Sequence, residues 1–371
     1  MSLRRRDFVR HAALGCAALV AGTPVRAQPV WPLDAEPGSG SGSEPSHGSY
    51  AQRPEALRWA DDAAQRRSLD AAWARQAIAS ANYQPRVAQL ILPPARKSAK
   101  NWRAYRQRFV EPVRIRRGAA FWTRNRAQLA RAQQQFGVPP EIIIGILGVE
   151  TIYGQNMGNF RVLDALATLA FDFPQGPSNA AERQAYFRDE LEHFLTLCQR
   201  TGMAPGEPRG SYAGAMGMPQ FMPSNWIRYA IDFDGDGRVD LWGSEADAIG
   251  SVANYFHAYG WKPGLPSHYP VRLSPAISQA DMDALLAPDI LPTFTPAAMA
   301  ARGVQLDAAA LANPRQLALV ELQNGDPSTP GNAPSYVAGT ENFYVITRYN
   351  HSSYYAMAVI ELGQAVAAAL T

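Results

Sequence analysis

The spacing of apolar and polar positions along the chain predicts a mainly α-helical protein. Helical periodicity runs through residues 54–135, where tryptophan and phenylalanine recur and prolines separate the segments. The run IIIGILGV, two residues after Pro140, is apolar on every side, as is typical of a helix buried in a core. The same reasoning predicts three further helices, over residues 180–199, 244–259 and 354–370.

The pattern changes between residues 264 and 339, where proline and glycine are frequent and apolar runs are short. Residues 317–322 have the composition of a strand, and residues 343–348 are expected to form another strand before the last helix. We therefore expect a mainly α fold of the α+β class. Its parts are a flexible Gly- and Ser-rich linker over 28–53, a helical subdomain over 54–138, a core over 139–263 completed by 342–371, and a small β-containing insertion over 264–341.

Residues 1–27 have the composition of an export signal. Arginines precede a short apolar stretch that cannot span a membrane, and small residues lead to a cleavage site after Ala27. Arg5 and Arg6 resemble the twin-arginine signal, so we expect a periplasmic protein exported by that route. The residues before Cys16 fit a lipid-attachment motif poorly, so a lipid anchor at Cys16 is not expected.

The charge of the chain argues against nucleic acid as a partner. The formal net charge of +3 becomes −1 when the five arginines and one aspartate of residues 1–27 are removed, whereas binding to a polyphosphate normally needs a net basic surface. Residues 96–131 are an exception, because they hold twelve basic residues and one acid, Glu111. This segment is either a solvated helix face or a docking surface for an anionic polymer or lipid.

Cysteine and histidine carry little sign of chemistry. Cys198 is the only cysteine after residue 27, so no internal disulfide can form, and its helical neighbours Phe194 and Leu195 indicate a buried structural thiol. The histidines have neither cysteine partners nor a metal-ligand spacing, and no phosphate-binding loop is present in the sequence.

Glu150 is the first candidate for catalysis. It ends the apolar run, where few polar neighbours are available to solvate its carboxylate, so its pKa is expected to be raised. A proton donor at neutral pH needs such a pKa. From this feature alone, a partly exposed structural glutamate at a helix end is an open alternative.

Five separated segments carry a family resemblance. They are GVETIYG at 148–154, RVLDALATL at 161–169, GSYAGAMGMPQFMP at 210–223, DAIGSVANYF at 247–256 and YVITRYN at 344–350. In this order they resemble the membrane-bound lytic murein transglycosylase B family over most of residues 60–371. The resemblance implies a lysozyme-like core that cleaves the β-1,4 bond between N-acetylmuramic acid and N-acetylglucosamine in peptidoglycan and leaves a 1,6-anhydromuramoyl end.

By resemblance, Glu150 is the single acid and base of this reaction. It would protonate the glycosidic oxygen and then deprotonate the C6 hydroxyl, which attacks C1 within the same sugar. The resemblance also implies a set of residues that bind the glycan or steady Glu150, namely Ser211, Met216, Gln220, Tyr255, Tyr349, Asn350 and Tyr355. We expect a monomer whose partners are glycan strands, with a cell-wall synthesis or remodelling complex as the other candidate partner.

Two alternative functions remain open. A hydrolytic muramidase would recruit Asp164 or Asp172 as a second carboxylate, although an amphipathic pattern around the first and a turn at the second favour structural roles. A non-catalytic protein would keep the glycan-binding groove as a peptidoglycan-binding scaffold without turnover.

An aspartate-rich segment has the spacing of a calcium-binding loop. Side-chain oxygens occupy loop positions 1, 3 and 5, a backbone carbonyl falls at position 7, and Gly243 replaces the usual glutamate at position 12. By resemblance this EF-hand-like loop spans 232–247, and its ligands are Asp232, Asp234, Asp236, Arg238 and Asp247. The implied calcium is structural, and the reaction needs no cofactor. The alternative is a capping turn in which Ser244 begins the next helix.

Overall fold

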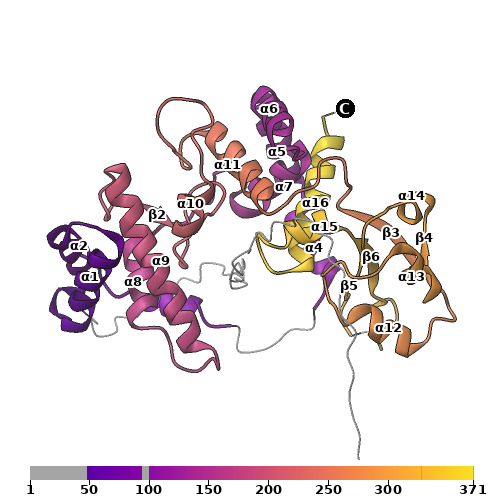
Figure 1. The fold of residues 1–371 in the computed structure, drawn as a ribbon, viewed down its shortest axis with the longest axis horizontal. Helices are drawn as coiled ribbons and strands as arrows, with labels where there is room; N and C mark the ends of the chain where they lie inside the picture. The colour runs from indigo at the N-terminus through magenta and orange to yellow at the C-terminus, as the bar shows by residue number, and fades with distance from the viewer. Residues whose placement is uncertain (1–47, 94–99, 327, 371) are drawn as a thin grey trace, which may run out of the picture.

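The structure of the chain is a computed structural model that describes residues 48–93, 100–326 and 328–370. The predicted signal peptide, residues 1–27, lies outside the described residues. Helices dominate the described chain, as the apolar pattern predicts, and two small antiparallel sheets accompany them (Figure 1). Among the described residues, no helix has both the length and the apolar character needed to cross a membrane.

Short helices form the N-terminal part: η1 (Tyr50–Gln52), α1 (Pro54–Arg67), α2 (Ala71–Ala79), α3 (Pro85–Leu90), α4 (Trp102–Phe109), α5 (Pro112–Arg124) and α6 (Arg126–Phe136). Proline occupies the first turn of α1, α3 and α5, where a backbone N–H would have no partner within the helix. Packing begins earlier than the sequence predicts. Tyr50 is fully buried in the core, although it falls within the expected linker over 28–53.

The remaining helices are α7 (Pro140–Thr151), α8 (Val162–Phe171), α9 (Ala180–Thr201), α10 (Pro223–Tyr229), α11 (Glu245–Ala258), α12 (Gln279–Leu286), α13 (Pro296–Ala301), α14 (Ala308–Leu311), α15 (Glu341–Ile346) and α16 (Ser353–Ala368). Helix α9 packs against both α8 and α10, and α11 packs against α6 (Figure 1). The structure confirms α9, α11 and α16 to within two residues of the predicted ends.

The packing of α7 against α16 forms the centre of the core. A Cβ atom added at Gly145 would lie 2.1 Å from the carbonyl oxygen of Val359, and one added at Gly363 would lie 2.0 Å from that of Glu141. The two backbones therefore approach too closely for any side chain larger than hydrogen. This contact packs the last helix of the chain directly against α7.

The strands form two antiparallel sheets. In the smaller sheet β1 (Phe160–Arg161) pairs with β2 (Arg209–Gly210). The larger sheet has the order β4-β3-β6-β5 and contains β3 (His268–Leu273), β4 (Val304–Leu306), β5 (Ala318–Leu322) and β6 (Ser335–Gly339). It lies at one end of the molecule with α12, α13 and α14 (Figure 1) and has a hydrophobic cluster of its own. The strand predicted at 317–322 is confirmed as β5.

The strand predicted at 343–348 is wrong, because this segment begins within helix α15. The Thr340 hydroxyl accepts a hydrogen bond from the backbone N–H of Asn342 and caps the helix. Phe343 and Ile346 are both fully buried and lie three residues apart, on one face of the helix. The aromatic and β-branched composition favours a strand. The Thr340 cap and the helical spacing of the buried residues favour a helix more strongly.

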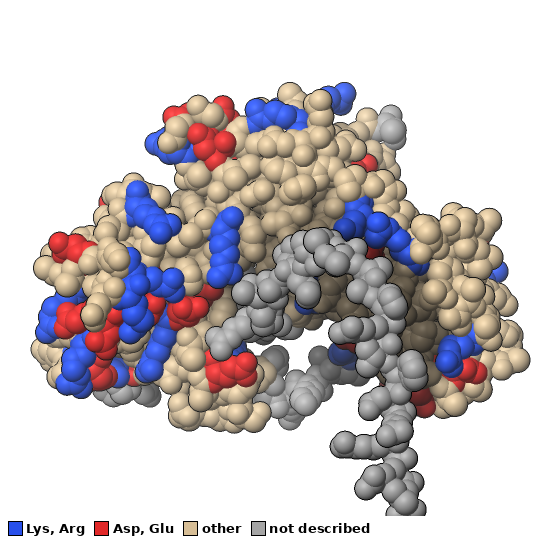
Figure 2. Space-filling model, viewed as in Figure 1, with Lys and Arg blue, Asp and Glu red and all other residues tan. Residues whose placement is uncertain are grey.

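Much of the surface charge is paired within the molecule. Basic and acidic side chains interleave at the end formed by α1, α2 and α9 (Figure 2), where Arg66 and Arg67 both pair with Glu192. The arginine-rich segment is also partly neutralised, since Arg124 pairs with Glu245 of α11. Its basic residues are therefore a mixture of internal contacts and exposed charges.

Candidate active site

Glu150 lies in the last turn of α7, whose buried residues are apolar except for Thr151. Ile152 and Tyr153 follow with left-handed backbone angles, φ 52° and 58°, which turn the chain away from the helix axis. The hydroxyl of Tyr355, in the first turn of α16, donates a hydrogen bond to Glu150 Oε1. The close packing of α7 and α16 therefore brings the candidate acid against a residue two hundred positions later in the chain.

The environment of Glu150 changes its acidity. Burial raises the pKa of its carboxyl from 4.5 to about 7, and the hydrogen bond from Tyr355 opposes this shift more weakly. The raised pKa predicted from the sequence is confirmed. Because a carboxyl with a pKa near 7 populates both protonation states at neutral pH, it can donate a proton and later accept one.

The glycine-rich loop over 210–223 lies against the end of α7. The Thr151 hydroxyl donates a hydrogen bond of 2.8 Å to the carbonyl oxygen of Met218. Gln220, at a left-handed φ of 51°, donates from its side chain to two backbone carbonyls. The Ser211 hydroxyl accepts a backbone N–H within the loop. These bonds fix the conformation of the loop and hold it against the end of α7.

Aromatic rings join this loop to the segment between α15 and α16. The rings of Tyr349 and Tyr355 stack with centroids 6.4 Å apart, and the Tyr349 hydroxyl donates to the carbonyl oxygen of Pro219. Tyr255 of α11 lies behind, with its ring centroid 4.8 Å from that of Tyr349 and its hydroxyl bonded to the carbonyl oxygen of Arg348. The structure thus brings together most of the residues expected to bind glycan.

Three of those residues are placed differently from the expectation. Met216 and Tyr355 are 0% exposed and Tyr255 is 1% exposed, so they support the wall of the site from behind and do not line a groove. Partly exposed positions remain for Ser211, Gln220, Tyr349 and Asn350. The side-chain oxygen of Asn350 is buried without a hydrogen-bond partner in the described part of the chain, and such unpartnered acceptors are rare in folded proteins.

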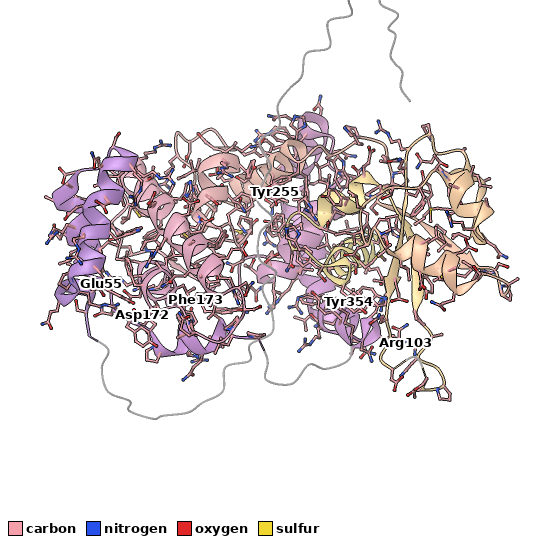
Figure 3. The ribbon with its side chains drawn as sticks, turned by 60° about the horizontal axis from the view of Figure 1, so that its bottom comes forward. Glu55, Arg103, Asp172, Phe173, Tyr255 and Tyr354 are labelled. Carbon is pink, nitrogen blue, oxygen red and sulfur yellow. The ribbon has the colours of Figure 1, made fainter. Side chains whose placement is uncertain are left out.

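The alternative catalytic acids have structural partners. Asp164 accepts a hydrogen bond of 2.9 Å from the backbone N–H of Asn82. Asp172 accepts from the hydroxyl of Tyr50 and pairs with Arg53. Figure 3 shows Asp172 with Glu55 at the α1 end of the molecule, far from Tyr354, the neighbour of Tyr355. The structural roles predicted for both aspartates are confirmed.

Sequence reasoning missed a second buried carboxyl, that of Glu190 in α9. It is 3% exposed and accepts two hydrogen bonds from Ser224, one from the backbone N–H at 2.9 Å and one from the hydroxyl at 2.6 Å. Burial raises its pKa to about 7. Its position could have been found from the helical spacing, because it lies three residues after Phe187 and four before Phe194, on the apolar face.

The aspartate-rich loop brings three carboxylates together, with one oxygen of each within 4.8 Å of the others, in Asp232, Asp234 and Asp247. Asp236 instead pairs with the side chain of Arg238, and Glu245 is held by Arg124. The Ser244 hydroxyl accepts the backbone N–H of Asp247 and caps α11. The capping turn and the candidate metal cluster therefore exist together. Carboxylate oxygens are the ligands that calcium prefers, so this donor set fits the ion.

The thiol of Cys198 is not part of the site. Cys198 is fully buried, and burial raises the pKa of its thiol to about 12, which confirms the predicted structural thiol. Within the described ranges, the three aspartates are the only cluster of His, Cys, Asp or Glu side chains arranged to hold a metal ion.

A carboxyl of pKa about 7 at the end of α7, with the Tyr355 hydroxyl against it, has the chemistry that acid and base catalysis requires. The transglycosylase SLT domain family matches residues 52–364. The chain is also 38% identical over 361 residues to the membrane-bound lytic murein transglycosylase B of Escherichia coli strain K12, which covers 90% of each protein. The chain belongs to this family of lytic transglycosylases.

Solved structures agree with the assignment. The E. coli lytic transglycosylase Slt35 in complex with calcium is 39% identical, with a TM-score of 0.74, and the match covers 87% of this chain and 96% of that one. Pseudomonas aeruginosa SltB3 in complex with NAG-anhNAM-pentapeptide is 29% identical, with a TM-score of 0.66 and coverage of 82% and 78%. The family resemblance and the mainly α fold predicted from the sequence are confirmed.

Proposed function

We propose that this lytic transglycosylase cleaves the β-1,4 bond between N-acetylmuramic acid and N-acetylglucosamine and leaves a 1,6-anhydromuramoyl end, with Glu150 as the single acid and base. The observation that carries the proposal is the Glu150 carboxyl, which has a pKa of about 7 and a hydrogen bond from Tyr355. The anhydro sugar named in the SltB3 complex supports this product.

In the first step the protonated Glu150 carboxyl donates its proton to the glycosidic oxygen, and the bond from that oxygen to C1 of the muramoyl residue breaks. The carbonyl oxygen of the substrate's own 2-acetamido group stabilises the positive charge at C1, so no second carboxylate is needed. The Tyr355 hydroxyl then donates to a charged acceptor, which strengthens that hydrogen bond as the carboxylate forms.

In the second step the Glu150 carboxylate takes the proton of the C6 hydroxyl, and O6 forms a bond to C1 of the same sugar. This restores the protonated acid and closes the anhydro ring. An intramolecular nucleophile has a high effective concentration, so it outcompetes water.

Four partly exposed residues are proposed to hold the glycan, namely Ser211, Gln220, Tyr349 and Asn350. The ring of Tyr349 offers an apolar face to a sugar ring, and the unpartnered oxygen of Asn350 accepts a hydrogen bond from an acetamido N–H or a hydroxyl. Since the SltB3 ligand is a glycan unit that carries a pentapeptide, we infer that peptide-bearing glycan is also the substrate class here.

A structural calcium ion is proposed in the loop over 232–247, held by Asp232, Asp234 and Asp247 with the Arg238 backbone carbonyl and Asp236 as further ligands. Calcium binding only to the folded state should raise the melting temperature, because a ligand at 100 times its Kd stabilises by about 2.7 kcal/mol. Differential scanning calorimetry with calcium and with chelator measures this rise. Asp247→Asn should remove it, while Glu245→Gln, at a residue bound to Arg124, should retain it; an unchanged wild-type melting temperature would contradict the proposal.

The export of the protein and its docking to other cell-wall components are predictions from the sequence. We propose a periplasmic location reached by the twin-arginine route, although residues 1–27 lie outside the described part of the chain. A cell-wall complex could dock on the exposed charges of α4 and α5, such as Arg103 and Arg117, because Arg106 and Arg114 already have internal partners. Reversing the charge at Arg103 and Arg117 should then weaken recovery of partner proteins or sacculi.

The experiment that tests the reaction is digestion of purified sacculi by residues 28–371, followed by mass spectrometry of the released muropeptides. Wild type should release anhydro products, which are lighter than hydrolysed ones by one water molecule, and Glu150→Gln should release none. Glu141→Gln, on the same helix, is the matched control and should behave as wild type. Reducing-end products would indicate a muramidase, and binding without release would indicate a scaffold.

A further inference from the structure

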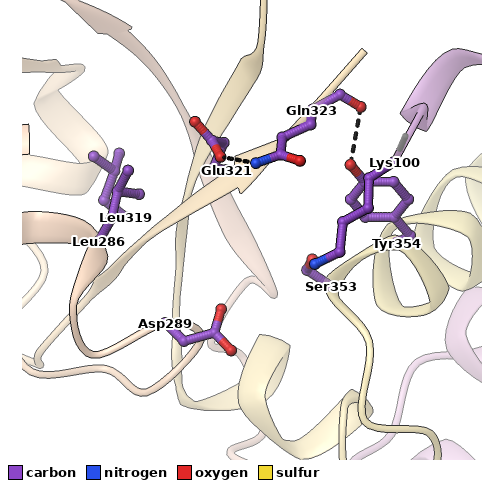
Figure 4. Close-up of a pocket in the computed structure, with 8 residues that line it drawn as sticks. All are labelled: Lys100, Leu286, Asp289, Leu319, Glu321, Gln323, Ser353 and Tyr354. Carbon is purple, nitrogen blue, oxygen red and sulfur yellow. Dashed lines mark hydrogen bonds between the residues drawn. The ribbon is translucent and has the colours of Figure 1, made fainter. Parts of the chain in front are cut away.

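A small cavity lies between the four-stranded sheet and the start of α16 (Figure 4). Its volume is about 130 Å³, which accommodates a few water-sized groups, such as the end of a peptide, and not a disaccharide. The polar residues that line it are Lys100, Asp289, Glu321, Gln323, Ser353 and Tyr354. Nothing in the proposed reaction uses these side chains.

The charges of the cavity are not paired with one another. The Lys100 ammonium group and the Asp289 carboxylate form no ion pair with any described residue. The Glu321 carboxylate accepts hydrogen bonds from two uncharged groups, the Gln323 amide at 2.8 Å and the Tyr336 hydroxyl at 3.0 Å. One cation and two carboxylates around one cavity match a ligand that carries a carboxylate and an ammonium group.

Asp289 occupies an unusual backbone position for a charged residue. Its φ is 54°, in the left-handed region that glycine adopts most easily, three residues after the end of α12. Aspartate and asparagine are the side-chain-bearing residues that adopt this region most readily. Asparagine tolerates the same backbone region, which provides a variant that removes the charge and keeps the turn.

Helix α16 connects the cavity to the candidate active site. Tyr355 donates to Glu150, while the preceding Tyr354 donates a hydrogen bond of 2.9 Å to the carbonyl oxygen of Gln323 at the cavity (Figure 4). Consecutive Cα atoms are about 3.8 Å apart, and an extended peptide of four residues spans up to about 14 Å. Because Tyr354 and Tyr355 are consecutive, the cavity and the candidate acid are both contacted by the first turn of α16.

We propose that this cavity binds the end of the peptide carried by the muramoyl residue at the cleavage site. The Lys100 ammonium group would bind a peptide carboxylate, and Asp289 with Glu321 would bind a peptide ammonium group. This inference rests on the proposed function, because it assigns a subsite to the same substrate. The peptide thereby selects which muramoyl residues of a glycan strand are cleaved efficiently.

The test compares glycan strands that carry their peptides with the same strands after an amidase has removed the peptides. Wild type should have the lower KM on peptide-bearing strands. Asp289→Asn and Lys100→Met should each raise that KM by roughly two- to fivefold, the range of an exposed charge pair, with kcat unchanged. Neither variant should change KM on peptide-free strands. Asp62→Asn, an exposed aspartate on α1, is the control and should match wild type on both substrates.

The outcomes separate the two proposals. No cleavage of either substrate by wild type would overturn the proposed function itself. Cleavage of both with equal KM, or a peptide preference that Asp289→Asn and Lys100→Met retain in full, would overturn the cavity assignment and leave the reaction intact. Loss of the preference when the salt concentration is raised would support binding through charge.

Discussion

Burial raises the carboxyl pKa of both Glu150 and Glu190 to about 7, yet the two glutamates lie in different structural environments. Glu150 ends α7, is partly exposed, and has a hydrogen bond from the Tyr355 hydroxyl. Glu190 lies in the middle of α9, is 3% exposed, and binds both the backbone N–H and the hydroxyl of Ser224, where α10 begins.

The difference shows what a raised pKa does and does not indicate. A raised pKa shows that a carboxyl group is buried away from solvent. Such burial occurs both at catalytic sites and at the interface between two packed helices. Both carboxylate oxygens of Glu190 accept hydrogen bonds from Ser224 at the start of α10. Few lone pairs therefore remain for a substrate. Glu150 is partly exposed at the end of α7, so a ligand can reach it.

The largest expected effect is on turnover. Glu150→Gln keeps the size of the side chain and removes the acid, so kcat on sacculi should fall by about 10²- to 10⁴-fold, the usual contribution of a general acid or base. Glu190→Gln should leave kcat within about threefold, because that carboxyl holds the fold and touches no substrate. Release of muropeptides per folded molecule measures both. Equal losses in the two variants would show that the comparison is mistaken.

The next effect concerns the hydrogen bond that distinguishes Glu150. Tyr355→Phe removes a donor to the carboxylate, so kcat should fall by about tenfold or more, in line with a hydrogen bond to a charged group. The bond from Tyr355 lowers the pKa of Glu150, so the high-pH limb of kcat/KM should also move to higher pH. Tyr344→Phe, in α15, serves as the matched variant. A lower kcat with an unmoved pH profile would mean that Tyr355 acts only on the fold.

A smaller effect is expected on stability, at the other carboxyl. Ser224→Ala removes one hydroxyl donor to Glu190, so the free energy of unfolding in urea should fall by about 1–3 kcal/mol, with kcat per folded molecule retained. Ser328→Ala removes a hydroxyl that donates to the exposed Asp326 and should change stability by less than about 0.5 kcal/mol. If both variants lose the same free energy of unfolding, the hydrogen bond between α9 and α10 stabilises the fold no more than an exposed one does.

The sequence predicted some parts of this comparison and not others, for physical reasons. The place and acidity of Glu150 follow from a local apolar run, which one segment of sequence contains in full. Glu190 was missed because its role depends on Ser224, a residue of another helix. The helix at Glu341–Ile346 was mistaken for a strand because composition outweighed the Thr340 cap. The burial of Met216 and Tyr255 also depends on packing between distant segments.

The last prediction uses pH to test whether both carboxyls are buried as described. A carboxyl whose pKa is raised from 4.5 to about 7 by folding binds its proton more tightly in the folded state, so its contribution to stability is lost as pH rises across that range. Burial lowers the pKa of His193, His268 and His351, which acts in the opposite direction. The informative quantity is therefore the difference in unfolding free energy between wild type and variant, in which the histidines cancel.

As pH rises from about 4.5 to about 7, wild type should lose stability relative to both Glu150→Gln and Glu190→Gln. The reason is that each variant lacks one carboxyl group with a raised pKa. Urea unfolding at several pH values measures it. A shift for Glu190→Gln alone would mean that water reaches Glu150 in the folded state and that its pKa is ordinary. Equal shifts, together with a loss of turnover only in Glu150→Gln, would establish that burial raises the pKa of both carboxyl groups by the same amount. The two sites would then differ only in access to the substrate.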